Sequence, residues 1–320
     1  MIKQMSKAIQ LVQQLKVGNS LGEGVIWDHR QQCLYWTDIL AKQFYCWNFN
    51  GQPSQYPCPK RLCSFGLTQH QGWLIAAFDN GFAFFHPASG QVIPLTQVET
   101  NQQHTRMNDG RVDRQGRFWA GTMCEENSPQ CAALYRLEDD YQAKKMLDDV
   151  QIANGLCWSP DAKTMYFADS ARQVISRSDF NPQSGEFKNS QPWITTASGA
   201  FPDGSCVDSE GFLWNAQWGS ATVKRYHPNG QLVLTVDIPC EQPSCICFGG
   251  PNLNHLFVTS AAKGLHSKGH SLGSSDGDLF IYHTPFKGLH ESICRLTLPA
   301  QSTNNDLPKI TTKSRKYHGQ

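Results

Sequence analysis

The stretch Asp113-Arg-Gln-Gly-Arg-Phe-Trp-Ala-Gly-Thr-Met123 joins a polar turn to a short apolar strand that is rich in aromatic residues. Comparable strands occur at 34–39, 73–79, 164–170, 212–218 and 255–261. A cluster of Asp, Asn, Gly or Pro precedes most of them, and such clusters favour hairpin turns. The central residues of the six strands, spaced 39 to 48 residues apart, are Trp36, Ile75, Trp119, Tyr166, Trp214 and Phe257.

Further strands and turns follow several of these centres, for example at 81–90, 174–182 and 222–230. Each unit therefore contains about four short strands in a period near 45 residues, which is typical of a propeller blade. A β-sandwich would not repeat so evenly, and an α/β fold would need helical patterns between the strands. We therefore predict an all-β fold, a six-bladed β-propeller with four antiparallel strands per blade and a central metal site.

The 320 residues are enough to bury a large core without disulfides or structural metals. We expect residues 1–300 to form one propeller domain, in which the segment before Leu21 supplies a strand or a cap that closes the ring. Residues 301–320 are polar and lack a repeat centre, so they are predicted to form a partly disordered tail.

Charge and hydropathy narrow the classes of partner. The chain has 28 Lys and Arg against 27 Asp and Glu, so it has no basic field for nucleic acid. No segment approaches the ~18 apolar residues that span a bilayer, and the N-terminus lacks a signal-peptide core. The 12 cysteines form no C-x-x-C pair, and we expect reduced thiols. These features favour a cytoplasmic monomer or weak dimer with neither a membrane nor a nucleic-acid partner.

Residues at the same position in successive repeats predict a site on the propeller axis. The innermost strand of each blade lines the central channel, so positions ten or eleven residues before each core strand converge there. Four of the six carry a carboxylate or amide side chain within two residues of a glycine, and the other two are Ser64 and Cys245. These four residues are Glu23, Asn108, Asn154 and Asp203.

Glu, Asn and Asp without His or Cys form a set of donors suited to hard cations such as Ca²⁺ or Mg²⁺. Two carboxylates would offset the two charges of such an ion. The alternative is that Asn-Gly and Asp-Gly are simply turn dipeptides, although their recurrence in four repeats favours a metal site. The sequence contains no H-E-x-x-H, G-x-S-x-G, Walker or EF-hand motif.

Four motifs around these positions are Leu21-Gly-Glu-Gly-Val-Ile-Trp27, Arg106-Met-Asn-Asp-Gly-Arg-Val-Asp113, Ile152-Ala-Asn-Gly-Leu-Cys-Trp-Ser159 and Phe201-Pro-Asp-Gly-Ser-Cys-Val-Asp208. Through these motifs the chain resembles, between about residues 20 and 290, the SMP-30/gluconolactonase/luciferin-regenerating-enzyme family, the regucalcin-like sugar lactonases. The family fold is a six-bladed propeller, in agreement with the number of repeats.

The resemblance implies one divalent metal ion, Ca²⁺, Zn²⁺, Mn²⁺ or Mg²⁺, held by Glu23, Asn154 and Asp203. It also implies that this ion assists the hydrolysis of a sugar lactone (an aldonolactone, as in gluconolactonase) to the aldonic acid. The metal would polarise the ester carbonyl while Asp203, as the catalytic residue, takes a proton from the attacking water.

The resemblance further implies that Arg106, Asn108 and Glu126 contact the substrate, with Glu125 as the alternative to Glu126. Asn108 is also expected to approach the metal, directly or through water. This polar set suits a polyhydroxylated substrate better than an apolar ester. Another metal-dependent ester or phosphotriester hydrolase and a non-enzymatic calcium-binding protein remain as alternatives. The sequence leaves open whether a glucono-, galactono-, arabinono- or xylonolactone is used.

Overall fold

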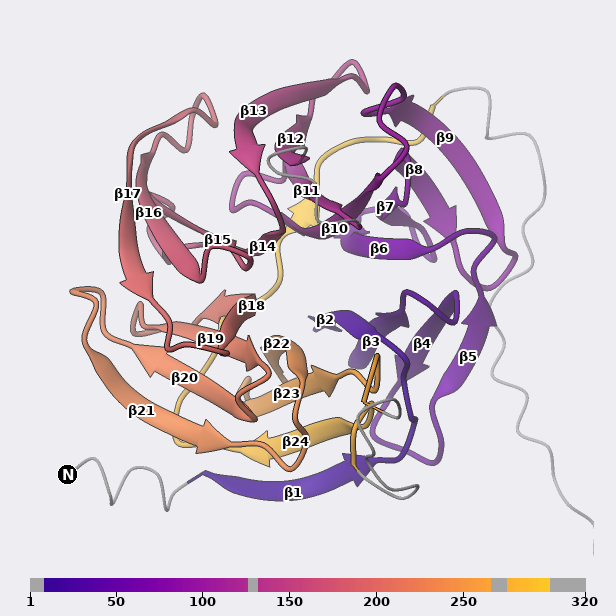
Figure 1. Cartoon of the computed structure of the whole chain (residues 1–320). Coiled ribbons are helices and arrows are strands. Elements are labelled where there is room, and N and C mark those ends of the chain that lie inside the picture. The colour runs from indigo at the N-terminus through magenta and orange to yellow at the C-terminus, as the bar shows by residue number, and fades with distance from the viewer. Residues whose placement is uncertain (1–8, 126–131, 266–274, 300–320) are drawn as a thin grey trace, which may run out of the picture.

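A computed structural model describes residues 9–125, 132–265 and 275–299. These residues form six β-sheets arranged as blades around a ring (Figure 1). Five blades have four strands and one has five. The predicted six-bladed β-propeller is thereby confirmed, with the fifth strand of one blade as an addition. The predicted tail at 301–320 lies outside the described residues.

Four consecutive strands of each of blades 1 to 5 run outward from the axis, whereas blade 6 takes its outermost strand, β1 (Gln10–Leu15), from the start of the chain. Blade 1 contains β2 (Gly22–Asp28), β3 (Cys33–Asp38), β4 (Gln43–Trp47) and β5 (Ser54–Pro57). Blade 2 contains β6 (Leu62–Thr68), β7 (Leu74–Phe78), β8 (Gly81–His86) and β9 (Gln91–Gln97). Blade 3 contains β10 (Thr105–Val112), β11 (Phe118–Cys124), β12 (Ala132–Leu137) and β13 (Ala143–Val150). Blade 4 contains β14 (Ala153–Trp158), β15 (Thr164–Asp169), β16 (Val174–Phe180) and β17 (Phe187–Thr195). Blade 5 contains β18 (Phe201–Val207), β19 (Leu213–Trp218), β20 (Thr222–Tyr226) and β21 (Leu232–Asp237). Blade 6 contains β22 (Pro243–Gly249), β23 (His255–Ser260), β24 (Leu279–His283) and β1.

Two strands from the chain ends tie the ring together. β1 pairs antiparallel with β24, so the segment before Leu21 does supply the closing strand of blade 6 (Figure 1). β25 (Ile293–Cys294) pairs in parallel with β6 and becomes the fifth strand of blade 2. The ring is therefore held by strand pairing near both chain ends.

Aspartate turns form the hairpins between the first and second strands of blades 3 and 5. Asp113 accepts two backbone N–H groups of its own turn and, at 3.1 Å, the indole Nε1–H of Trp119. Asp208 repeats this pattern two blades later, with Trp214 donating at 2.9 Å. A carboxylate that satisfies its own turn favours that turn locally, and here it also anchors the aromatic centre of the blade.

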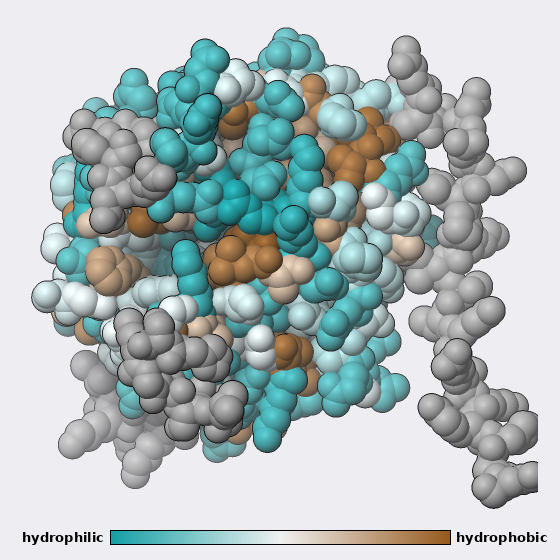
Figure 2. Space-filling view, turned by 45° about the vertical axis from the view of Figure 1, so that its right-hand side comes forward, coloured by the Kyte–Doolittle hydropathy of each residue, from teal (hydrophilic) through white to brown (hydrophobic). Residues whose placement is uncertain are grey.

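All six strand centres identified in the sequence are buried in the structure. Burying one large apolar side chain stabilises the fold by roughly 1.5–3 kcal/mol. The innermost strands of neighbouring blades also contact one another around the ring. On the face shown in Figure 2, hydrophobic residues lie in separate patches among hydrophilic ones, which is ordinary for a protein surface.

Ten of the cysteines are free thiols, nine of them buried, and they pack as small apolar residues. Cys124 is disulfide-bonded, so the expectation of reduced thiols is wrong for this residue. In the ranges that the structure describes, no helix is long and apolar enough to cross a bilayer.

Candidate active site

Each innermost strand contains a break in register near its start. In β2 the break follows Glu23 and in β14 it follows Asn154. The next residues, Gly24 and Gly155, have φ values of 61° and 62°, a left-handed conformation that glycine adopts without steric cost. These glycines therefore belong to β-bulges inside strands, and the interpretation of the Asn-Gly pair as a simple turn dipeptide is wrong.

The other two predicted site residues lie one residue further along their strands, relative to the bulge. Asn108 in β10 and Asp203 in β18 are the first residues inside their bulges, whereas Glu23 and Asn154 precede theirs. The four positions are thus not strictly equivalent. A bulge turns a side chain out of the regular alternation of a strand, and this allows residues offset by one to face the same channel.

Three predicted residues are joined by hydrogen bonds. Arg106 Nη1 donates to Asn108 Oδ1 at 2.8 Å, and Asn108 Nδ2 donates to Asn154 Oδ1 at 2.9 Å. Asn154 Nδ2 in turn donates to Ser170 Oγ at 2.8 Å. This chain of contacts links blades 3 and 4 and fixes the orientation of both amide groups.

Glu23 and Asp203 are two buried carboxylates that influence one another. Burial, followed by the charge of Asp109, raises the pKa of Glu23 to about 8. Burial, followed by the charges of Glu23 and then Asp109, raises the pKa of Asp203 well above its ordinary value. Among the described residues, Asp203 Oδ1 is buried without a hydrogen-bond partner. The two carboxylates therefore share a small desolvated space that holds too little positive charge.

Asp109 is a site residue that the sequence analysis missed. It is the second residue of the bulge in β10, and its carboxylate accepts the backbone N–H groups of Gly110 at 2.9 Å and Leu156 at 3.1 Å. Burial raises the pKa of Asp109 as well. Its position directly after Asn108 was a signal, since a bulge brings two consecutive residues toward one side.

This arrangement fits a divalent cation. An unpaired buried carboxylate is costly, and a cation removes that cost. In the described ranges no group of three or more His, Cys, Asp and Glu side chains could hold a metal, so the amide oxygen of Asn154 would complete the set with Glu23 and Asp203. Oxygen-only donors of this kind suit hard cations.

Charged side chains gather beside this carboxylate cluster. Glu125 Oε1 lies 2.6 Å from Arg61 Nη1 and 3.4 Å from Arg106 Nε. Although burial opposes ionisation, the hydrogen bonds from Arg61 hold the pKa of Glu125 below its ordinary value. Partial burial, followed by the charge of Arg106, lowers the pKa of Lys263. Glu125 is thus the glutamate placed beside Arg106, while Glu126 lies outside the described residues.

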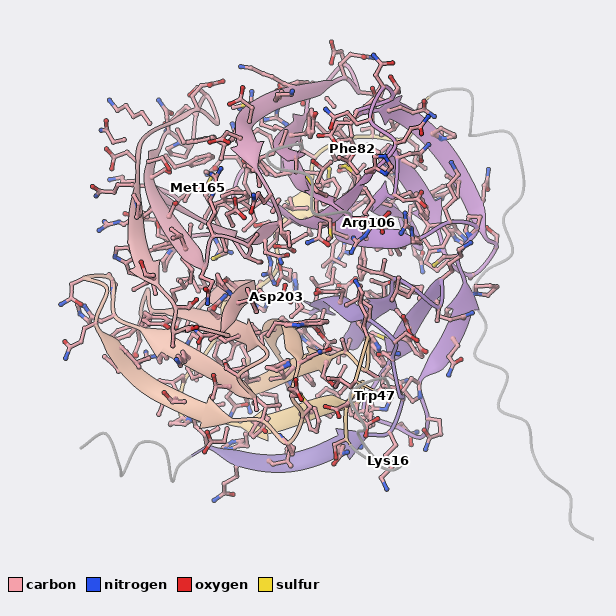
Figure 3. The ribbon with its side chains drawn as sticks, in the orientation of Figure 1. Lys16, Trp47, Phe82, Arg106, Met165 and Asp203 are labelled. Atoms are coloured by element: carbon pink, nitrogen blue, oxygen red, sulfur yellow. The ribbon has the colours of Figure 1, made fainter. Side chains whose placement is uncertain are left out.

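Figure 3 shows Arg106 and Asp203 near the central channel, in strands of different blades. Arg111 lies three residues after Asn108 on β10, about 10 Å further along the strand. Its guanidinium pairs with Glu291 at 2.6 Å, in the segment that follows β24. In Figure 1 this yellow segment crosses the centre of the ring. Glu291 therefore lies near the end of β10 that is remote from Arg106.

Comparison with known proteins agrees with this geometry. The family model described as SMP-30/Gluconolactonase/LRE-like region matches residues 21–262. L-arabinolactonase of Azospirillum brasilense is 38% identical over 277 residues, covering 85% of this chain and 91% of that protein. 6-deoxy-6-sulfogluconolactonase of Pseudomonas putida is 36% identical over 249 residues, covering 76% of this chain and 84% of that protein.

A solved structure of regucalcin, a calcium-binding protein from Agrobacterium tumefaciens, superposes with a TM-score of 0.84 at 26% identity. The matched region covers 89% of this chain and 98% of the regucalcin chain. The resemblance stated from the motifs and the prediction of a lactonase-family hydrolase are thereby confirmed. The chain belongs to the SMP-30/gluconolactonase/LRE-like family.

Proposed function

We propose that the protein hydrolyses a sugar lactone to the open-chain sugar acid with the help of one divalent metal ion. The observation that carries this proposal is the pair of buried carboxylates, Glu23 and Asp203, with an unpartnered oxygen on Asp203. Two relatives that are named as sugar lactonases support the substrate class. A relative described as calcium-binding supports the metal.

A divalent cation held by Glu23, Asn154 and Asp203 would supply Lewis-acid polarisation of the lactone carbonyl. The protein's own groups perform the remaining steps. Asp203 Oδ1, which has no hydrogen-bond partner among the described residues, accepts a proton from the attacking water and returns it to the ring oxygen as the ester bond breaks. Because the site is buried, the charge that develops on the carbonyl oxygen interacts strongly with neighbouring dipoles and cations.

Arg106 and Asn108 orient the substrate. Arg106 uses Nη1 to donate to Asn108 Oδ1 and to the backbone carbonyl of Met107, both at 2.8 Å. Its second terminal nitrogen, Nη2, makes no hydrogen bond to the described residues and can therefore donate to a sugar hydroxyl or to the carbonyl. Holding the ester in this way lowers the entropic part of the barrier. We propose Glu126 as a further substrate contact, in line with the family resemblance.

The test is proton release in weak buffer from a panel of aldonolactones. The protein is first treated with EDTA and then assayed after separate addition of Ca²⁺, Zn²⁺, Mn²⁺ or Mg²⁺. We expect at least one lactone to be hydrolysed only when a metal is present. Folded protein that hydrolyses no lactone with any of the four ions contradicts the proposal, and activity unaffected by EDTA contradicts the role of the metal.

A further inference from the structure

A polar cavity lies beside Arg106, where blades 2 and 3 meet, and we call it the seam cavity. Its volume is about 210 Å³, and it lies between the turn after β7, the segment after β9, and the strands β10 and β11. The side chains that matter for its chemistry are Asp79, Glu99, Gln102, Thr105, Arg106 and Thr122. Arg106 thus belongs both to this cavity and to the hydrogen-bonded chain that reaches the metal-binding residues.

Glu99 presents a fixed acceptor in this cavity. One oxygen, Oε1, accepts hydrogen bonds from Thr122 Oγ1 at 2.8 Å and from Tyr135 OH at 3.1 Å. The pKa of Tyr135 is raised by burial and by the charge of Glu99, so the phenol stays protonated and keeps donating. The other oxygen, Oε2, is buried without a partner among the described residues. Leaving such an acceptor unsatisfied costs about 1–3 kcal/mol, and a ligand hydroxyl toward which the carboxylate turns would remove that cost.

The chemistry of the lining narrows the class of ligand. Asp79 and Glu99 disfavour an anion at this place, while the guanidinium of Arg106 disfavours a bare cation. Carboxylates, hydroxyls, an amide and a guanidinium together match a neutral group with several hydroxyls, each of which both donates and accepts. At ~30 Å³ per water molecule, the cavity holds about seven waters, which is room for one sugar ring and too little for a peptide.

We propose that this seam cavity is a second subsite, which binds a glycosyl unit attached to the lactone, so that the protein acts on disaccharide lactones. The inference rests on the proposed function, because it assigns a substrate class to the same site. Arg106 lies where the two rings of such a substrate meet, and Glu99 Oε2 accepts a hydroxyl of the outer ring.

The test compares kcat/KM for gluconolactone and for its 4-O-glucosyl derivative. We expect the glucosylated lactone to be the better substrate by about tenfold, which corresponds to about 1.4 kcal/mol. Gln102→Trp places a bulky ring in the seam cavity and should lower kcat/KM for the glucosylated lactone about tenfold more than for gluconolactone. Gln103→Trp is the matched control, because Gln103 is exposed and does not line the cavity; it should leave the ratio of the two values unchanged.

The outcomes separate this inference from the proposed function. Hydrolysis of both lactones with equal kcat/KM, unaltered by Gln102→Trp, overturns the subsite and leaves the lactonase intact. If neither lactone is hydrolysed, the proposed function fails, and the subsite is judged by saturation-transfer NMR with the glucosylated gluconic acid. Saturation of the outer ring in the parent protein, lost in Gln102→Trp, supports the cavity as a sugar site. No saturation of that ring in the parent protein overturns it.

Discussion

Replacing Glu23 by Gln should stabilise the metal-free protein and remove its metal-dependent activity. Glu23 is buried, and its pKa is raised from 4.5 to about 8. The folded protein therefore keeps a proton that the unfolded chain releases above pH 4.5. With a raised carboxylate pKa, the free energy of unfolding falls as the pH rises from 4.5 to about 8 and is unaffected by this group outside that range.

The size of the effect follows from the same pKa. One pH unit of pKa displacement corresponds to about 1.4 kcal/mol. The ionisable group therefore lowers the free energy of unfolding by about 3 kcal/mol at pH 7 and by about 4 kcal/mol at pH 8. Gln has nearly the same shape as Glu and carries no charge, so the Glu23→Gln variant is spared this loss. Its carbonyl can still accept the Gly24 N–H that Glu23 accepts now.

The measurement is urea unfolding of EDTA-treated protein at pH 6, 7 and 8, followed by tryptophan fluorescence. The advantage of Glu23→Gln should grow by about 1 kcal/mol for each pH unit. Added Ca²⁺ should then reverse the order, because the ion stabilises only a folded protein that binds it. Glu186→Gln is the control: Glu186 is exposed, and hydrogen bonding to Lys144 lowers its pKa. This control should show no pH-dependent gain over the range.

Equal stability of Glu23→Gln and the parent protein at pH 8, without metal, would refute the reasoning. That result would mean that the Glu23 carboxylate finds solvent or a cationic partner when it ionises. A gain in stability that does not change with pH would also count against it, because improved packing alone would then explain the gain.

Three further substitutions test other parts of the molecule. Asp203→Ala should lower kcat at least about a hundredfold and leave the far-ultraviolet circular dichroism unchanged. Arg61→Met should raise KM about tenfold, with little change in kcat, because Glu125 loses the guanidinium that holds it beside Arg106. Asp208→Ala should lower the free energy of unfolding in urea by about 3–5 kcal/mol, with KM unchanged, because the buried guanidinium of Arg225 keeps only the exposed carboxylate of Glu210 and the buried indole N–H of Trp214 loses its acceptor.

Each of these expectations can fail separately. Parent-level turnover in Asp203→Ala would remove Asp203 from the reaction. An unchanged KM in Arg61→Met would mean that Glu125 does not act on the substrate side of Arg106. A loss below about 1 kcal/mol for Asp208→Ala would place that ion pair among the weak surface pairs.

The blades could be predicted from the sequence because each blade is a local feature. The strand that follows each aspartate turn carries its own bulky centre, and strands joined by short turns pair with each other. The ring closure could be predicted for a related reason. The first repeat begins at Leu21, so the chain before it was expected to supply a strand or a cap outside that repeat. β25 could not be predicted, because a pairing of two residues with a strand more than 220 positions away leaves no periodic signal.

The site was predicted less completely because its geometry depends on bulges. A bulge adds one residue to one strand and leaves the partner strand unchanged, so counting back from the core strands brought Glu23 and Asp203 together without showing their offset. Asp109 was missed for the same reason. The pairing of Arg61 with Glu125, 64 residues apart, depends on how two blades meet, and so does the position of Glu99 at the seam.

The bulges also explain how the propeller tolerates charge on its axis. The side chains that stabilise the blades, such as Trp119 and Trp214, lie within the sheets, whereas Glu23 lies directly before a bulge and Asp203 lies inside one. Removing the axial charge therefore leaves the blade contacts intact, and the penalty for burying that charge becomes an affinity for a cation. Stability and activity should thus respond in opposite directions to changes at Glu23, whereas changes at Asp208 should affect stability alone.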